Sequence, residues 1–252
     1  MPTETRKPQD LFTLNVVAPH LEGFRPPQGP HDPRGDWTLA YVVYTLGAIG
    51  GPGGRIGSLV VRRKAADDGG AILAIEYEKR VNPQYVQKVV AEITCRGDAL
   101  ATPVRWTFSS EIAGGASGAD GPVENTRIEQ SATAEDGHVE IRDGTHSRRL
   151  AAGPPLAINW ALFEAVGRLP REAFDPIRFT LVDHFDQLKP GQVLSYRLST
   201  DVLLAGQPVR LHAYDHLGEG VVPWIYWVDD RGRLLFAVSG LEAYLVDSFR
   251  PS

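Results

Sequence analysis

The residues best suited to metal chemistry lie in one stretch, HAYDHLGEGVVPWIYWVDD, at positions 212–230. His212, His216 and Glu219 are residue types that ligate transition metals. If the stretch is an extended strand, the two imidazoles are roughly 13 Å apart, because a strand rises about 3.3 Å per residue. One ion needs its ligands about 2 Å away, so a bulge at Asp215 would be required. We therefore predict no metal and no cofactor, and keep these three residues as the alternative.

Carboxylates offer a second chemistry. Asp183, Asp186 and Glu219 stand near strand ends, and a glycosidase uses two such groups, one to protonate the leaving oxygen and one to attack or to activate water. Proteins that act on sugars also line their clefts with tryptophan. A carbohydrate-active, glycoside hydrolase-like enzyme with a carboxylate pair in a Trp-lined cleft is therefore the alternative function.

Aromatic residues are the most informative group. A curved sheet too wide for its own side chains to fill leaves room for a ligand, and such cavities are lined mainly by aromatic and apolar groups. The candidate ligand-binding residues from the sheet and from the segment near position 160 are Trp106, Trp160, Phe163, Tyr214, Trp224, Tyr226 and Trp227. Without a ligand, the same residues would form an ordinary core.

The elements that position these residues are mostly strands. In AILAIEYEK, Leu73, Ile75 and Tyr77 share one face, while Glu76 and Glu78 take the other. This period of two, with one apolar and one polar face, is typical of antiparallel sheets. The stretch PVRWTFSSEI alternates in the same way.

Turn signals recur between these runs. Tight turns join antiparallel neighbours, and an open sheet of ten or more strands tends to curl. We therefore predict a mainly β protein, a curved antiparallel meander that forms a half-barrel or barrel-like sandwich. The predicted turns are at 65–70, 82–84, 96–100, 135–137, 189–192, 205–208 and 229–232.

One segment favours a helix. INWALFEAVGRLP places Ile158, Leu162, Val166 and Leu169 on one stripe and ends at Pro170, which cannot continue a helix. We predict one short helix near 158–169 that covers or plugs one end of the curved sheet.

The chain divides near position 35. Residues 1–35 are rich in proline with little periodicity, which favours extended, loop-like backbone over a helix. We predict a Pro-rich N-terminal arm at 1–35 and a single β domain at 36–252. The glycine-rich stretch 47–57 is expected to be a hairpin loop and not a phosphate-binding loop, since no Lys-Ser or Lys-Thr follows it. The stretch 114–122 is Gly-rich and poor in apolar residues, and is expected to be an exposed loop.

Bulk composition excludes some partners. The 252 residues carry a formal net charge of −5, which argues against nucleic acid, since that binding needs clustered Lys and Arg. The single cysteine, Cys95, permits no intrachain disulfide and is expected to be a buried thiol. No segment approaches 18 apolar residues and the N-terminus shows no signal peptide, so we predict no transmembrane segment. The oligomeric state is not predicted.

Three phrases carry a resemblance to known proteins: PPLAINWALFEAVGRLP, FDQLKPGQVLSYRL and YWVDDRGRLLF. With the meandering first half, they resemble a domain-of-unknown-function family of bacterial envelope proteins over roughly Trp37 to Val246. The resemblance implies a curved antiparallel sheet with a short central helix, similar to lipoprotein-carrier half-barrels, and a periplasmic or envelope location. It implies no catalytic residues.

The predicted function is a non-enzymatic binding or envelope-structural role. The ligand would be small, apolar or amphipathic, and would lie between the curved sheet and the helix.

Overall fold

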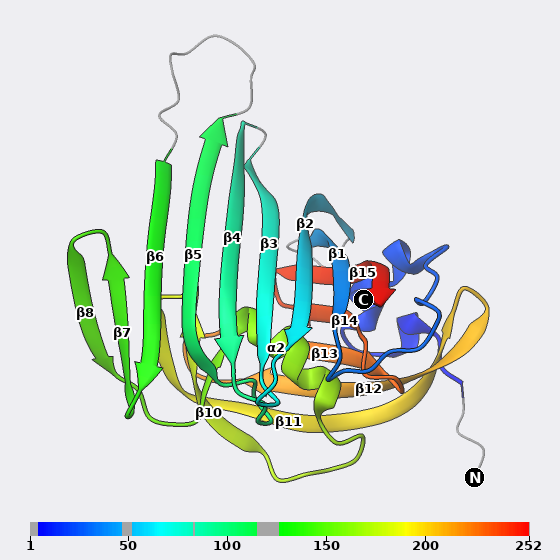
Figure 1. Cartoon of the computed structure of the whole chain (residues 1–252). Coiled ribbons are helices and arrows are strands. Elements are labelled where there is room, and N and C mark those ends of the chain that lie inside the picture. The colour runs from blue at the N-terminus through cyan, green and yellow to red at the C-terminus, as the bar shows by residue number, and fades with distance from the viewer. Residues whose placement is uncertain (1–4, 47–51, 83, 115–125, 252) are drawn as a thin grey trace.

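The computed structural model describes residues 5–46, 52–82, 84–114 and 126–251, and these form one curved 15-stranded sheet around a short helix (Figure 1). The strands of the first half are β1 (Trp37–Leu46), β2 (Pro52–Ala65), β3 (Ala71–Asn82), β4 (Tyr85–Cys95), β5 (Pro103–Gly114), β6 (Thr126–Glu135), β7 (His138–Asp143) and β8 (His146–Ala151). The second half contains β9 (Leu156–Ile158), β10 (Ile177–Asp183), β11 (Gln187–Leu204), β12 (Gln207–Leu217), β13 (Trp224–Asp229), β14 (Leu234–Ser239) and β15 (Glu242–Pro251).

Two meanders make up the sheet. In space the strand order is β8 to β1, followed by β15 down to β9. Every pair of neighbours is antiparallel except β9 and β10, which are parallel. Pairing of β1 with β15 joins the two meanders, and β8 and β9 are the free edges of a sheet that does not close. The predicted fold class is confirmed.

Alternation of side chains accounts for the strands. Ala71, Leu73, Ile75 and Tyr77 of β3 are all buried, and the residues between them face outward. Cys95 of β4 is buried as a free thiol, as predicted.

The predicted turns at 65–70, 96–100, 135–137, 205–208 and 229–232 separate consecutive strands and are confirmed. The turn predicted at 189–192 is wrong, because these residues lie inside β11. There Gly191, at a φ of 71°, accompanies a shift of register between β10 and β11, which a bulge produces without reversing the chain. The actual turn is at 184–186, where His184 and Phe185 have φ of 50° and 68°.

The loop predicted at 47–57 is wrong over residues 52–57, which belong to β2, where pairing with β1 and β3 overrides the glycine content. Its residues 47–51, and residues 115–122 of the loop predicted at 114–122, lie outside the described residues.

The helix α2 (Asn159–Ala165) lies in the hollow between the two meanders (Figure 1). It is shorter than predicted, because Ile158 belongs to β9 and Val166–Arg168 form the 3-10 turn η3. The predicted stripe is nevertheless buried, from Ile158 through Leu162 and Val166 to Leu169. Within the described ranges, none of the helices has the length and apolar character needed to cross a bilayer.

A buried ionic cluster lies at the C-terminal part of α2. Glu164 of α2 accepts hydrogen bonds from Arg63 Nε at 2.9 Å and from Arg168 Nε at 2.8 Å. Arg63 also donates to the carbonyl oxygens of Arg34 and Gly35. The cluster ties α2 to β2 and to the segment before β1, and so fixes the position of the helix in the hollow.

The N-terminal segment differs from the prediction of loop-like backbone. It contains three short helical elements, η1 (Pro8–Asp10), α1 (Leu14–Val17) and η2 (Ala18–Leu21). Leu11, Leu14, Val17 and Leu21 are buried in the hydrophobic core. The indole Nε1 of Trp227 donates to Thr13 Oγ1 at 3.1 Å, so this segment covers the side of β13 that faces away from α2.

Candidate ligand-binding cavity

A cavity of about 410 Å³ lies beside α2, between the two meanders. The helix end of its wall comes from Ile158, Asn159, Trp160, Leu162 and Phe163. The first meander contributes Tyr77, Lys79, Gln87, Val89, Phe108, Ser110, Ile128 and Gln130. The second meander and the 184–186 turn contribute His184, Phe185, Asp186, His216, Trp224, Tyr226, Glu242 and Tyr244.

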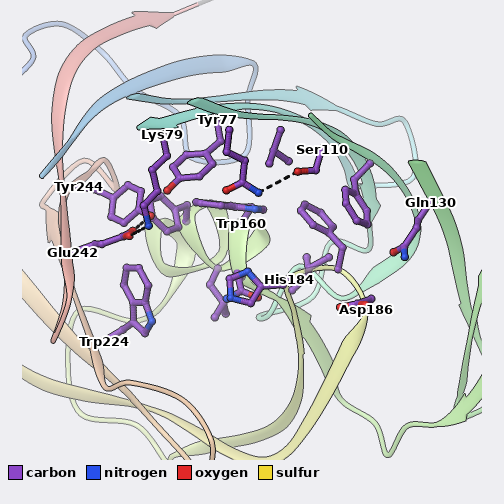
Figure 2. Close-up of a pocket in the computed structure, with 18 of the residues that line it drawn as sticks. Tyr77, Lys79, Ser110, Gln130, Trp160, His184, Asp186, Trp224, Glu242 and Tyr244 are labelled. Carbon is purple, nitrogen blue, oxygen red and sulfur yellow. Dashed lines mark hydrogen bonds and ion pairs between the residues drawn. The ribbon is translucent and has the colours of Figure 1, made fainter. Parts of the chain in front are cut away.

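Aromatic rings dominate the wall next to the helix. Six of them, which we call the aromatic cluster, are in mutual contact: Tyr77, Trp160, Phe163, Trp224, Tyr226 and Tyr244. The centroid of Trp160 is 5.2 Å from that of Tyr77 and 5.7 Å from that of Phe163. In Figure 2 the indole of Trp160 crosses the middle of the cavity, with Tyr77 on one side and Trp224 opposite. Because each ring is held by its neighbours, the apolar wall is largely preformed.

The tyrosines of this wall are uncharged. Burial raises the pKa of Tyr226 and the pKa of Tyr244 well above the ordinary value of 10.0. Burial raises the pKa of Tyr77 as well, and the nearby charge of Glu242 adds to the effect. The aromatic cluster therefore presents neutral surface to the cavity at physiological pH.

One side of the cavity carries an ion pair. Lys79 of β3 pairs with Glu242 of β15, and the hydroxyl of Tyr244 donates to Glu242 Oε2 at 2.8 Å. The two charged side chains are 31% and 19% exposed, so the pair lies where the cavity meets solvent. Asp186 lies on the opposite side of the cavity (Figure 2). It pairs with Arg148 at 3.0 Å.

A second polar group surrounds Asp183, at the end of β10. Asp183 Oδ1 accepts from Asn159 Nδ2 at 2.7 Å, and Asp183 Oδ2 pairs with Lys189. Burial would raise the pKa of this carboxyl, but the hydrogen bonds from Lys189 and Asn159 outweigh it, and the net shift is downward. Asp183 is therefore ionised at neutral pH and holds the amide of Asn159 in one orientation.

His216 of β12 is 1% exposed and lines the same cavity. Its Nε2 lies 3.2 Å from Gln192 Oε1. Gln192 Nε2 in turn donates to the carbonyl oxygens of Pro190 and Glu219. Burial lowers the pKa of His216 to about 4, although the charge of Asp183 opposes this. The imidazole is therefore neutral at physiological pH.

The candidate aromatic residues are divided between three places. Trp160, Phe163, Trp224 and Tyr226 line the cavity. Trp106 donates from Nε1 to Phe185 O at 3.1 Å and holds the 184–186 turn. The hydroxyl of Tyr214 donates to Pro170 O at 2.8 Å and accepts from Arg171, while Trp227 lies beneath the N-terminal segment.

The alternative metal residues are not brought together. His212 Nδ1 lies 2.5 Å from Ser199 Oγ, and its Nε2 lies 2.7 Å from Asp230 Oδ1. His216 faces the cavity, and Glu219 follows the end of β12. In the part of the chain that the structure describes, no three His, Cys, Asp or Glu side chains are grouped as metal ligands would be.

The alternative carboxylates are also dispersed. Only Asp186 lines the cavity, whereas Asp183 is bonded to Lys189 and Glu219 lies in the loop after β12. A glycosidase acid must carry a proton, which requires a raised pKa. The pKa of Asp183 is lowered instead, so this arrangement does not favour glycoside chemistry.

Other lining residues were not among the candidates. The alternation of β3 identifies Tyr77 only as a residue of the apolar face, and Lys79 follows it on the same face. Asn159 stands at the start of the predicted helix, where no sequence pattern marks it as a cavity residue. The partner of Lys79, Glu242, is 163 positions away along the chain, and no local sequence pattern connects the two.

Comparison with known proteins places the chain by its fold. No protein-family model matches it, and no curated protein matches its sequence. A solved structure, the beta-barrel-like protein of domain of unknown function DUF1849 from Brucella abortus, is similar with a TM-score of 0.55 and 10% sequence identity. The match covers 86% of this chain and 98% of that chain. It shows a shared fold and supports the resemblance to a β-barrel-like domain-of-unknown-function protein, while the envelope location stays a prediction.

Proposed function

We propose that the protein binds one small apolar or amphipathic ligand between the curved sheet and α2, without transforming it. The observation that carries this proposal is the aromatic cluster beside the helix. The cavity volume of about 410 Å³ falls in the range of roughly 300–1,000 Å³ typical of small-molecule sites. Covering this apolar wall with a ligand removes it from water, which supplies the binding free energy.

The mixed lining supports an amphipathic ligand in particular. The apolar wall is continuous from Tyr77 to Tyr226, while polar side chains such as Gln87 and Ser110 lie on the first meander. A ligand with one polar end can satisfy both kinds of surface.

The charges support binding without a reaction. Asp186 and Glu242, the two carboxylates that line the cavity, each already hold a cation, Arg148 and Lys79. Neither is arranged as a free acid or base.

A matched pair of substitutions on β4 tests the proposal. Val89 is buried and lines the cavity, whereas Val90 is 56% exposed on the other face. Val89→Trp fills the cavity and should weaken binding of the neutral dye Nile red by about tenfold or more, a loss of about 1.4 kcal/mol. Val90→Trp adds the same side chain outside and should leave the affinity within about twofold, or about 0.4 kcal/mol. Dye fluorescence gives both affinities.

Circular dichroism and the melting temperature establish that both variants are folded, and Ser110→Phe provides a second way to fill the cavity. Equal dye affinity in the two tryptophan variants would place the binding elsewhere and contradict the proposal. So would turnover of a glycan by the wild-type protein that Asp186→Asn abolishes.

A further inference from the structure

In the hydrogen-bond network around Asp183 and His216, the structure determines which atoms donate and which accept. A carboxylate oxygen can only accept, so the bond to ionised Asp183 requires that the nitrogen of Asn159 points toward it. The opposite atom, Asn159 Oδ1, is then an acceptor. It is buried and has no hydrogen-bond partner among the described residues.

The tautomer of His216 follows from the same kind of argument. Gln192 donates from its nitrogen to two backbone carbonyls, which leaves its oxygen facing His216 Nε2. The Nε2 atom must therefore carry the proton, and Nδ1 of the neutral ring carries the lone pair. Nδ1 is buried and without a partner in the described part of the chain.

These two acceptors belong to one region of the cavity. Both residues line it, Asn159 bonds directly to Asp183, and the charge of Asp183 acts on His216. Gln192, which holds Nε2, is not part of the lining, whereas His216 itself is. A buried acceptor left without a donor costs free energy, and a ligand that brings a donor removes that cost.

Charge decides which kind of donor fits. Asp183 is neutralised by Lys189, and the two carboxylates of the lining are neutralised by Lys79 and Arg148. Within the described lining, no carboxylate is left to balance a ligand's ammonium group, and Lys79 is not left to balance a carboxylate. A neutral donor suits this environment best.

We propose that the ligand is a neutral amphipathic molecule whose polar end is a hydroxyl group, which donates to His216 Nδ1 or Asn159 Oδ1 while its apolar part lies against the aromatic cluster. This inference rests on the proposed binding function and names the chemical class of its ligand. Figure 2 shows Trp160 with Tyr77, Tyr244 and Trp224 around it, the rings that the apolar part would lie against.

The test compares 1-decanol with its methyl ether, 1-methoxydecane, as competitors for bound Nile red. The two have similar apolar chains, but only the alcohol can donate. We expect the alcohol to displace the dye at an approximately tenfold lower concentration, as one buried hydrogen bond warrants. Equal potency would overturn this inference and leave the proposed function standing. If neither molecule displaces the dye, the proposed function itself fails.

Two histidines of β12 provide the matched variants. His216→Phe removes one of the two acceptors, and if the hydroxyl donates to His216 Nδ1 the alcohol-to-ether preference should fall to about one. His212→Phe is the control, because His212 is also buried but both of its nitrogens have partners and it does not line the cavity. It should keep the preference. If His216→Phe keeps the preference as well, His216 is not the acceptor, and a preference that also survives Asn159→Leu overturns the inference.

Decylamine, which is charged at neutral pH, tests the charge argument. It should compete less well than 1-decanol, because no unpaired carboxylate of the described lining receives it. Tighter binding of decylamine than of the alcohol would overturn the neutral-ligand part of the proposal.

Discussion

At the residue scale, His216 has the clearest physical signature in the molecule. It is almost completely buried, it has one satisfied and one unsatisfied nitrogen among the described residues, and its pKa is lowered to about 4 by burial. The same burial that keeps its Nδ1 a hydrogen-bond acceptor has a consequence for stability.

Between pH 6.5 and about 4 the unfolded chain protonates this imidazole and the folded chain does not, because the pKa is lowered on folding. The free energy of unfolding therefore falls as the pH falls through this window. His216 alone should contribute a loss of about 3 kcal/mol between pH 7.5 and pH 4. Urea unfolding at both pH values measures it.

His216→Phe isolates this contribution, since it removes the titrating group. Other groups also respond to acid, among them His31, whose pKa burial lowers to about 4. The variant should therefore keep part of the pH dependence and lose about 3 kcal/mol of it. An unchanged difference between the two pH values would show that His216 is protonated normally in the folded protein.

The sequence predicts which face of the sheet a side chain points to only where a local pattern, such as alternation along a strand, determines it. Alternation along β13 puts Tyr226 and Trp227 on opposite faces, and the structure places Tyr226 in the cavity and Trp227 under the N-terminal segment. The sequence could not decide which of the two faces surrounds a cavity, because both are buried. The ion pair between Lys79 and Glu242 depends on tertiary contact and has no local signal.

At the element scale, α2 is held by a buried charge network as well as by apolar contacts. The side chains of Arg63 and Glu164 are 3% and 1% exposed. Glu164→Gln would leave two arginines without their carboxylate, and breaking a buried pair costs about 3–5 kcal/mol. We expect a loss of that size in urea unfolding.

An exposed ion pair that involves Arg62, the neighbour of Arg63 on β2, gives the control. Arg62 of β2 and Glu76 of β3 are 44% and 53% exposed, and such pairs contribute about 1 kcal/mol or less. Glu76→Gln should therefore have a small effect. If the two substitutions destabilise the protein equally, the buried cluster is not what anchors the helix.

Strands and turns were the most predictable elements, because period-two alternation and turn residues are local. The errors have local causes too. Gly191 and Pro190 resemble a turn but lie at a bulge of β11. In the N-terminal segment, Leu11, Leu14, Val17 and Leu21 follow a helical spacing, which the proline content obscured. Those short helices are stable only because they are buried against the sheet.

At the scale of the whole molecule, the hollow results from how the two meanders are joined. Strand β1 pairs with β15 along nearly its whole length, from Trp37 opposite Pro251 to Thr45 opposite Glu242. A sequence predicts that such a long meander must curl, but it does not predict which distant strands pair or in which register. The curvature, and with it the cavity beside α2, follows from that pairing.

The most direct test of the account uses the tryptophans as position markers. Of the five, Trp160 and Trp224 line the cavity, whereas Trp37, Trp106 and Trp227 are buried elsewhere. In protein with isotope-labelled tryptophan and bound 1-decanol, nuclear Overhauser effects should connect the methylene protons of the ligand to the indoles of Trp160 and Trp224 only. Contacts to Trp227 or Trp37 instead, or ligand binding with no contact to Trp160, would contradict a site between the curved sheet and the helix.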